Sequence, residues 1–88
     1  MYLAYTFHFV YVIRSRQNAS RFYVGYSKNP IHRLYSHNEG TKRRYTMAHR
    51  PWVLIYVERL STKCQALNRE KQLKSSRGRA WIKQNLLL

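Results

Sequence analysis

Four polar side chains in the first half of the chain are placed where they could do chemistry together. Tyr11 is in alternation with Ile13 in an apolar run, so its hydroxyl leaves a largely apolar strand face. Arg33 and His37 are four residues apart, and a helix projects such residues from one side. Together with Tyr23, these side chains can face a common groove. The planar guanidinium of an arginine in such a groove can donate two hydrogen bonds to phosphate oxygens. For each residue taken alone, the alternative is a tyrosine-rich hairpin packed on a basic helix.

Acidic residues are scarce enough to limit the chemistry. The chain has only three, Glu39, Glu58 and Glu70, whereas two-metal phosphodiesterases gather several carboxylates in one place. A metal-dependent phosphodiesterase built from this chain would therefore use one ion and one carboxylate. Glu70 is the best candidate, because it lies on the same side of its expected helix as Ala66 and Leu73. An unpaired charge on an apolar side is costly, so Glu70 is expected to bind a cation; the alternative partner is a nearby Arg or Lys.

The balance of charge points to a polyanionic partner. The 88 residues include 17 Lys and Arg against 3 acids, a formal net charge of +14, and basic residues are interleaved with aromatic ones, as in nucleic-acid-binding proteins. A membrane surface is not expected, because no segment shows the broad apolar face of an interfacial helix. Cys64 is the only cysteine, which excludes an internal disulfide and suits the cytoplasm. The cations expected to contact nucleic acid are Lys42, Arg43, Arg44, Arg50, Lys71 and Lys74.

These side chains need rigid elements to position them, and the apolar patterns predict six. Strands are expected at about 7–14, 21–27 and 52–57, and helices at about 30–38, 62–74 and 80–87, with Ser61 or Thr62 as the N-cap of the second helix. A chain of this length forms one domain, with residues 1–6 as a short extension. The predicted fold is a small α/β domain, in which helices flank a three-stranded, mainly antiparallel sheet in the order β-β-α-β-α-α.

The patterns also predict details of packing. The strand at 52–57 is expected to be central, and residues 39–50 are expected to form a basic loop with few apolar anchors. Gly25 is expected to leave space beside Tyr23, because a glycine within a strand often marks a close approach. The expected apolar sides of the helices are Ile31, Leu34 and Tyr35 in the first, Ala66, Leu67 and Leu73 in the second, and Trp81 with Ile82 in the third.

An ordered set of short motifs resembles the GIY-YIG nuclease family, and most closely its short single-domain members. The motifs are Val10-Tyr11, Tyr23-Val24-Gly25, Arg33-Leu34, His37-Asn38, Arg50-Pro51-Trp52 and Ala66-Leu67-Asn68-Arg69-Glu70. The resemblance covers roughly residues 7–86, nearly the whole chain. The first motif reads Phe9-Val10-Tyr11 where the family name has Gly-Ile-Tyr, and the second has Val24 in place of Ile, so both tyrosines are kept.

The resemblance implies a role for each candidate. Tyr11 and Tyr23 match the tyrosines that line the active site and orient the attacking water, and which of them acts as base stays open. Arg33 matches the arginine that holds the scissile phosphate, and His37 matches an additional active-site position. Glu70 matches the carboxylate that binds one divalent ion, Mg²⁺ or Mn²⁺. The implied function is metal-dependent cleavage of DNA at branched or damaged sites, in repair or recombination; the alternative is a non-catalytic module that binds nucleic acid.

Overall fold

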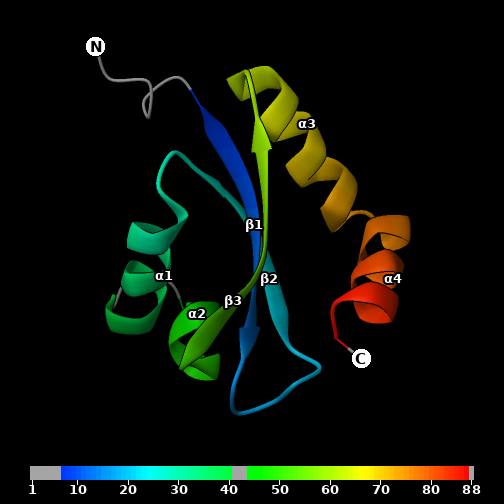
Figure 1. Ribbon diagram of the computed structural model, residues 1–88. Helices are drawn as coiled ribbons and strands as arrows, with labels where there is room; N and C mark the ends of the chain where they lie inside the picture. The colour runs from blue at the N-terminus through cyan, green and yellow to red at the C-terminus, as the bar shows by residue number, and fades with distance from the viewer. Residues whose placement is uncertain (1–6, 41–43, 88) are drawn as a thin grey trace.

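The computed structural model describes residues 7–40 and 44–87 and contains three strands and four helices (Figure 1). The order along the chain is β1 (His8–Ser15), β2 (Phe22–Ser27), α1 (Pro30–Glu39), α2 (Arg44–His49), β3 (Trp52–Leu60), α3 (Lys63–Lys74) and α4 (Ser76–Asn85). The predicted sheet and element order are therefore confirmed, with the short helix α2 as an addition. None of the helices in these two ranges is long and apolar enough to cross a membrane.

Strand β1 is the centre of the sheet, which has the order β2-β1-β3 and antiparallel pairing throughout. The prediction that the strand from Trp52 is central was wrong. Both faces of β1 are buried, with Val10 and Tyr11 each 0% exposed, whereas Val57 of β3 is 43% exposed. An apolar run thus does not distinguish a central strand from a half-covered edge strand. Strand β3 also runs further than predicted, because Leu60 pairs with His8.

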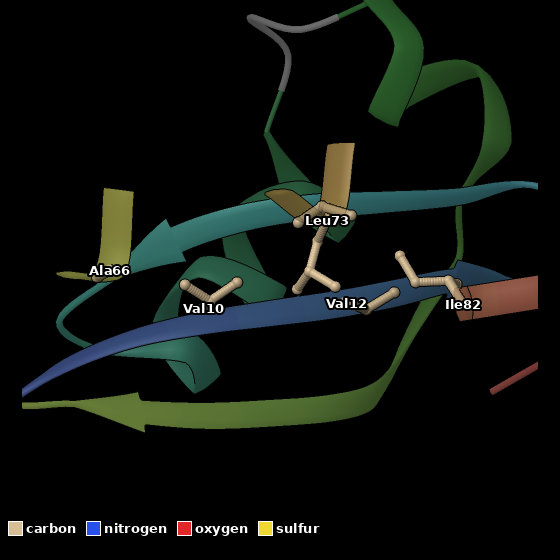
Figure 2. Close-up of a cluster of buried hydrophobic side chains, with 6 residues drawn as sticks. Val10, Val12, Ala66, Leu73 and Ile82 are labelled. Carbon is tan, nitrogen blue, oxygen red and sulfur yellow. The ribbon is translucent and has the colours of Figure 1, made fainter. Parts of the chain in front are cut away.

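The sheet has a helical layer on each face, as Figure 1 shows. Helices α3 and α4 cover the face of Val10 and Val12, and Figure 2 shows Ala66, Leu73 and Ile82 converging on these valines. Helices α1 and α2 lie on the other side of the sheet (Figure 1). That face carries a separate cluster of buried residues, Tyr11, Ile13 and Trp52, with Tyr23, Leu34 and Leu54 packed against it. Tyr11 and the helix that carries Glu70 are therefore on opposite faces of the sheet.

Side-chain caps fix where the helices begin. Asn29 Oδ1 accepts from the backbone N–H of His32, and Pro30 occupies the first turn of α1. Thr62, one of the two predicted caps, forms a capping box with Gln65 at the start of α3. Ser75 caps α4, which therefore begins at Ser76 instead of near residue 80.

In two helices, part of the side predicted from spacing is exposed. Ile31 and Tyr35 of α1 are each 66% exposed, and α1 buries His37 instead. Leu67 of α3 is 42% exposed, although Ala66 and Leu73 are buried as predicted. Apolar spacing was right for Leu34, which packs against the cluster of Tyr11, Ile13 and Trp52, but it missed His37, because the polar partner of His37, the Tyr11 hydroxyl, lies on the sheet. In α4, Ile82 is buried as predicted, while Trp81 is 38% exposed and packs edge-on to Tyr56.

Helix α2 replaces part of the predicted basic loop. Thr46 is buried, and its carbonyl oxygen accepts from Trp52 Nε1 at 2.8 Å. The Tyr45 ring lies 5.8 Å from the Trp52 ring, centroid to centroid. The segment before β3 thus has anchors, contrary to the prediction. Lys42 and Arg43 lie outside the described residues.

Candidate active site

A hydrogen bond between Tyr11 and His37 forms the centre of the candidate site. The Tyr11 hydroxyl oxygen lies 2.9 Å from His37 Nε2, and both side chains are buried. Tyr11 comes from the middle of the central strand and His37 from the last turns of α1. The two groups predicted to share a groove are therefore in direct contact, in a setting where a hydrogen bond is stronger than in water.

Gly25 allows Tyr11 to reach this position. The two residues are directly paired across β1 and β2, and a Cβ atom at Gly25 would collide with the hydroxyl end of the Tyr11 ring. The glycine therefore leaves space for Tyr11, not for Tyr23 as predicted. Because β2 is an edge strand, the hydroxyl of a central-strand residue lies over the open edge of the sheet.

This contact predicts the effect of a single methyl group. Gly25→Ala should move the Tyr11 hydroxyl away from His37 and lower the free energy of unfolding by about 1–3 kcal/mol, the usual cost of overpacking. Thermal melts would measure the stability. Gly40→Ala at the C-cap of α1, whose Cβ would meet the backbone of Ser36 instead, is the control outside the site. If Gly25→Ala keeps the stability of the wild type, the close approach has no structural importance.

Tyr23 joins the two sides of the site. Its ring centroid lies 5.0 Å from that of His37, in an edge-on arrangement, and 6.4 Å from that of Tyr45. The ammonium of Lys74, from α3, lies 5.5 Å from the Tyr23 ring centroid. Tyr23 on the edge strand thus contacts groups carried by helices on both faces of the sheet.

Glu70 approaches this cluster through Lys74. Glu70 Oε2 lies 3.2 Å from Lys74 Nζ, an (i, i+4) pair on α3 whose side chains are 20% and 49% exposed. The carboxylate is therefore neither unpaired nor deeply buried. Its partner in this structure is a basic residue, which was the alternative to a metal ion in the sequence analysis. The contacts run from Tyr11 through His37, Tyr23 and Lys74 to Glu70, around the edge of β2.

Arg33 lies one helical turn before His37 on α1 and is partly buried. Its Nε is buried and has no hydrogen-bond partner among the described residues. A buried N–H group without a partner is unfavourable, so a ligand oxygen at this point would satisfy it. The structure therefore brings Tyr11, Tyr23 and His37 into contact and places Arg33 beside them through its helix, whereas Glu70 is connected to them through Lys74.

The acids set the limits of a metal site. Glu58 is bound by Arg69 at 3.0 Å and by the Tyr56 hydroxyl at 2.8 Å; burial, and then this hydrogen bond to Glu58, raise the pKa of Tyr56. Within 7–40 and 44–87, no group of three or more His, Cys, Asp or Glu residues is close enough to hold an ion. A single carboxylate such as Glu70 would hold Mg²⁺ only together with waters and substrate phosphates, since this ion is bound through one or two carboxylates.

The predicted DNA-binding cations differ in how they are held. Arg50 Nη1 donates to the carbonyl oxygens of Asn38 and Gly40, at 2.8 and 2.9 Å, so this guanidinium closes the C-terminal end of α1. Lys71 is exposed on α3, and Lys74 is paired with Glu70. Arg44 begins α2. The role of these residues toward DNA stays a prediction.

Tyr45 is the residue of the site that sequence reasoning missed. Its ring packs against Tyr23, as noted, and against His49 at 4.8 Å between centroids. Its hydroxyl donates to the carbonyl oxygen of Phe22 at 3.1 Å, which fixes α2 against the edge strand. An aromatic residue in a basic stretch without helical periodicity gave too weak a signal to identify it.

Comparison with known proteins agrees with the geometry. The family model described as the GIY-YIG catalytic domain matches residues 7–85. The chain is 38% identical over 68 residues to a UPF0213 protein of Staphylococcus haemolyticus, and the match covers 77% of this chain and 80% of that protein. It is 40% identical over 68 residues to a UPF0213 protein of Staphylococcus epidermidis, with the same coverage of both chains.

Proposed function

This chain belongs to the GIY-YIG family of nuclease domains, and we propose that it is a divalent-metal-dependent endonuclease that cleaves phosphodiester bonds of DNA. The observation that carries the proposal is the 2.9 Å hydrogen bond between Tyr11 and His37, with Tyr23 beside it. A buried tyrosine paired with a buried histidine is not needed for binding nucleic acid. It is an arrangement through which a proton can pass.

We assign the proton transfer to Tyr11 and His37. A tyrosine hydroxyl is a weak base at neutral pH unless a second group takes its proton. When His37 Nε2 is unprotonated, it accepts the hydroxyl proton of Tyr11 as Tyr11 takes a proton from the attacking water. The same hydrogen bond orients the Tyr11 oxygen toward the open edge of β2. The edge-on Tyr23 ring then limits where the water can lie.

Arg33 and Glu70 are assigned to the phosphate and the metal. The guanidinium of Arg33 donates to the non-bridging oxygens of the scissile phosphate and so satisfies its buried Nε. Glu70 would hold the single ion, Mg²⁺ or Mn²⁺, which when bound would supply Lewis-acid polarisation of the phosphoryl oxygen and charge stabilisation for the leaving alkoxide.

The basic composition supports DNA as the substrate. A net charge of +14 on 88 residues favours contact with a phosphate backbone. We assign this contact to Lys42, Arg43, Arg44 and Arg50 near α2 and to Lys71 and Lys74 on α3. Branched or damaged DNA in the cytoplasm, as met in repair or recombination, is the proposed substrate.

Arg33 allows a test of phosphate binding. Arg33→Ala should lower turnover about 10²-fold or more, as does removal of a preorganised donor from a charge-stabilising site. Arg33→Lys should restore little activity, because an ammonium does not reproduce the planar fork. Single-turnover nicking with saturating DNA would measure both variants. Wild-type turnover in Arg33→Lys would show that Arg33 is one more surface cation.

A nicking assay tests the function itself. Linear, flapped and branched DNA would be incubated with the purified protein in Mg²⁺ or Mn²⁺, with and without a chelator. We expect cleavage that needs the metal and that is fastest on the branched or flapped DNA. DNA binding with no cleavage of any substrate would favour the alternative, a non-catalytic nucleic-acid-binding module.

A further inference from the structure

A basic pocket lies beside the proposed active site, against the edge strand β2. Its volume is about 370 Å³. Three cations, Arg21, Lys74 and Arg79, line it together with three aromatic rings, Phe22, Tyr23 and Tyr45. No acidic side chain is among the described residues of its lining. Such a lining suits an anion next to the site of cleavage.

The walls of the pocket are held by contacts that leave its cations exposed. The Arg79 guanidinium lies 5.7 Å from the Phe22 ring centroid, and the Tyr45 hydroxyl is bonded to the Phe22 carbonyl. Arg21, Lys74 and Arg79 are all exposed. The aromatic rings of Tyr23 and Phe22 therefore contact Lys74 and Arg79 without neutralising their charges.

Lys74 belongs both to this pocket and to the proposed metal site. Its ammonium lies 3.2 Å from Glu70 Oε2. The ammonium is therefore bound to the carboxylate that is proposed to hold the metal ion. An ammonium and a divalent ion on one carboxylate repel each other strongly at such distances. Metal binding to Glu70 therefore favours movement of Lys74 away from the carboxylate, and its exposed, flexible stem allows this.

We propose that Lys74 is a place-holding cation that couples metal binding to DNA binding. It pairs with Glu70 when no metal is bound. When a divalent ion binds to Glu70, the Lys74 side chain rotates so that its ammonium points into the basic pocket. There, with Arg21 and Arg79, it binds the DNA phosphate adjacent to the one that is cleaved. This proposal rests on the proposed function, because it takes Glu70 as the metal ligand.

Removing the charge of Lys74 should change two quantities in opposite directions: the affinity for the metal and the effect of the metal on DNA binding. Without its competitor, Glu70 should bind the metal more tightly. Without the released ammonium, metal should increase the affinity for DNA less than it does in the wild type. In the wild type, metal and DNA should strengthen each other by the same factor, because coupling between two sites is reciprocal.

The first experiment measures the metal alone. Lys74→Met keeps most of the stem and removes the charge, and Lys63→Met is the control, an exposed lysine at the start of the same helix. The melting temperature of each DNA-free protein would be followed as Mn²⁺ is added. We expect the Mn²⁺ concentration that raises the melting temperature by a fixed amount to fall about fivefold in Lys74→Met, within the usual range of coupling, and to stay unchanged in Lys63→Met. Equal Mn²⁺ concentrations for that shift in all three proteins would overturn the place-holding role.

The second experiment measures DNA. Binding of a fluorescent phosphorothioate oligonucleotide, whose linkages resist hydrolysis, would be followed by anisotropy with a chelator and with saturating Mn²⁺. We expect Mn²⁺ to raise the affinity of the wild type about fivefold and of Lys74→Met less than twofold. Arg79→Gln should weaken binding about tenfold in Mn²⁺, as loss of a phosphate contact does. Arg77→Gln, an exposed arginine of α4 outside the pocket lining, should weaken binding less.

The outcomes separate this inference from the function on which it rests. A wild-type protein that shows neither a Mn²⁺-dependent melting shift nor nicking would overturn both. A wild type that nicks with Mn²⁺, but whose Lys74→Met variant keeps the full effect of Mn²⁺ on DNA affinity, would overturn the coupling alone. Equal losses in Arg79→Gln and Arg77→Gln would show that the pocket is not a phosphate site.

Discussion

Replacing Glu70 with glutamine is expected to abolish metal-dependent DNA cleavage while leaving the protein folded. An amide of the same size does not replace a carboxylate as the ligand of a hard divalent ion. The ion contributes several kcal/mol to stabilising the transition state, so the loss should be about 10³-fold or more in turnover. Neither other acid can take over, because Glu58 is bound to Arg69 and Tyr56 and Glu39 is exposed at the end of α1.

The structure also predicts a small effect of Glu70→Gln on stability. The partner of Glu70 is Lys74, which is 49% exposed, so water solvates the ammonium when the carboxylate is lost. Breaking such a pair costs under about 1 kcal/mol. A fully buried basic partner would instead have predicted a loss of about 3–5 kcal/mol. DNA binding should be kept or strengthened, since a negative charge near the phosphate is removed.

Thermal melts and nicking rates of Glu70→Gln, on one preparation with and without Mn²⁺, would check this expectation. Glu39→Gln is the matched control, because it removes the same charge from an exposed position at the end of α1. Its turnover should be unchanged. A Glu70→Gln protein that melts lower than the wild type and yet nicks at the wild-type rate would contradict the metal-ligand assignment.

The sheet and most of the helices could be predicted from the sequence because local signals determine them. The apolar runs at β1 and β3 and the caps Asn29 and Thr62 act within a few residues of the elements that they specify. The Tyr11–His37 contact could also be anticipated. Strand alternation placed Tyr11 on one face, and the spacing of Arg33 and His37 gave them a common side of α1.

The remaining features depend on contacts between distant segments. Nothing in the run Trp52–Leu60 distinguishes an edge strand from a central one, and the polar partner that turns His37 inward lies on another element. Glu70 was expected on an apolar side, but α3 lies on the opposite face of the sheet from Tyr11 and the carboxylate reaches the edge of β2 beside Lys74. Such placements are set by packing between layers, which periodicity within one segment does not report.

Tyr11→Phe is expected to lower turnover about 10²–10⁴-fold, the usual contribution of general acid–base catalysis. The phenyl ring fills the same buried space, so the cost to stability should be limited to one hydrogen bond, about 1 kcal/mol. Tyr26→Phe is the matched control. Its hydroxyl is also bonded to a histidine, 2.8 Å from His8 Nδ1, but this pair is outside the site. Tyr26→Phe should therefore show a similar loss of stability and wild-type turnover.

The proposed proton transfer from Tyr11 to His37 can be tested with a double variant. If Tyr11 passes its proton to His37, the two side chains act as one unit, so the double variant Tyr11→Phe/His37→Gln should lose no more activity than the worse single variant. Single-turnover nicking at saturating Mn²⁺ would measure all three proteins, and melts would confirm that each is folded. Additive losses would mean that the two groups act independently. If Tyr11→Phe keeps wild-type turnover and Tyr23→Phe does not, the base is Tyr23, and the 2.9 Å bond between Tyr11 and His37 serves only to hold α1 against the sheet.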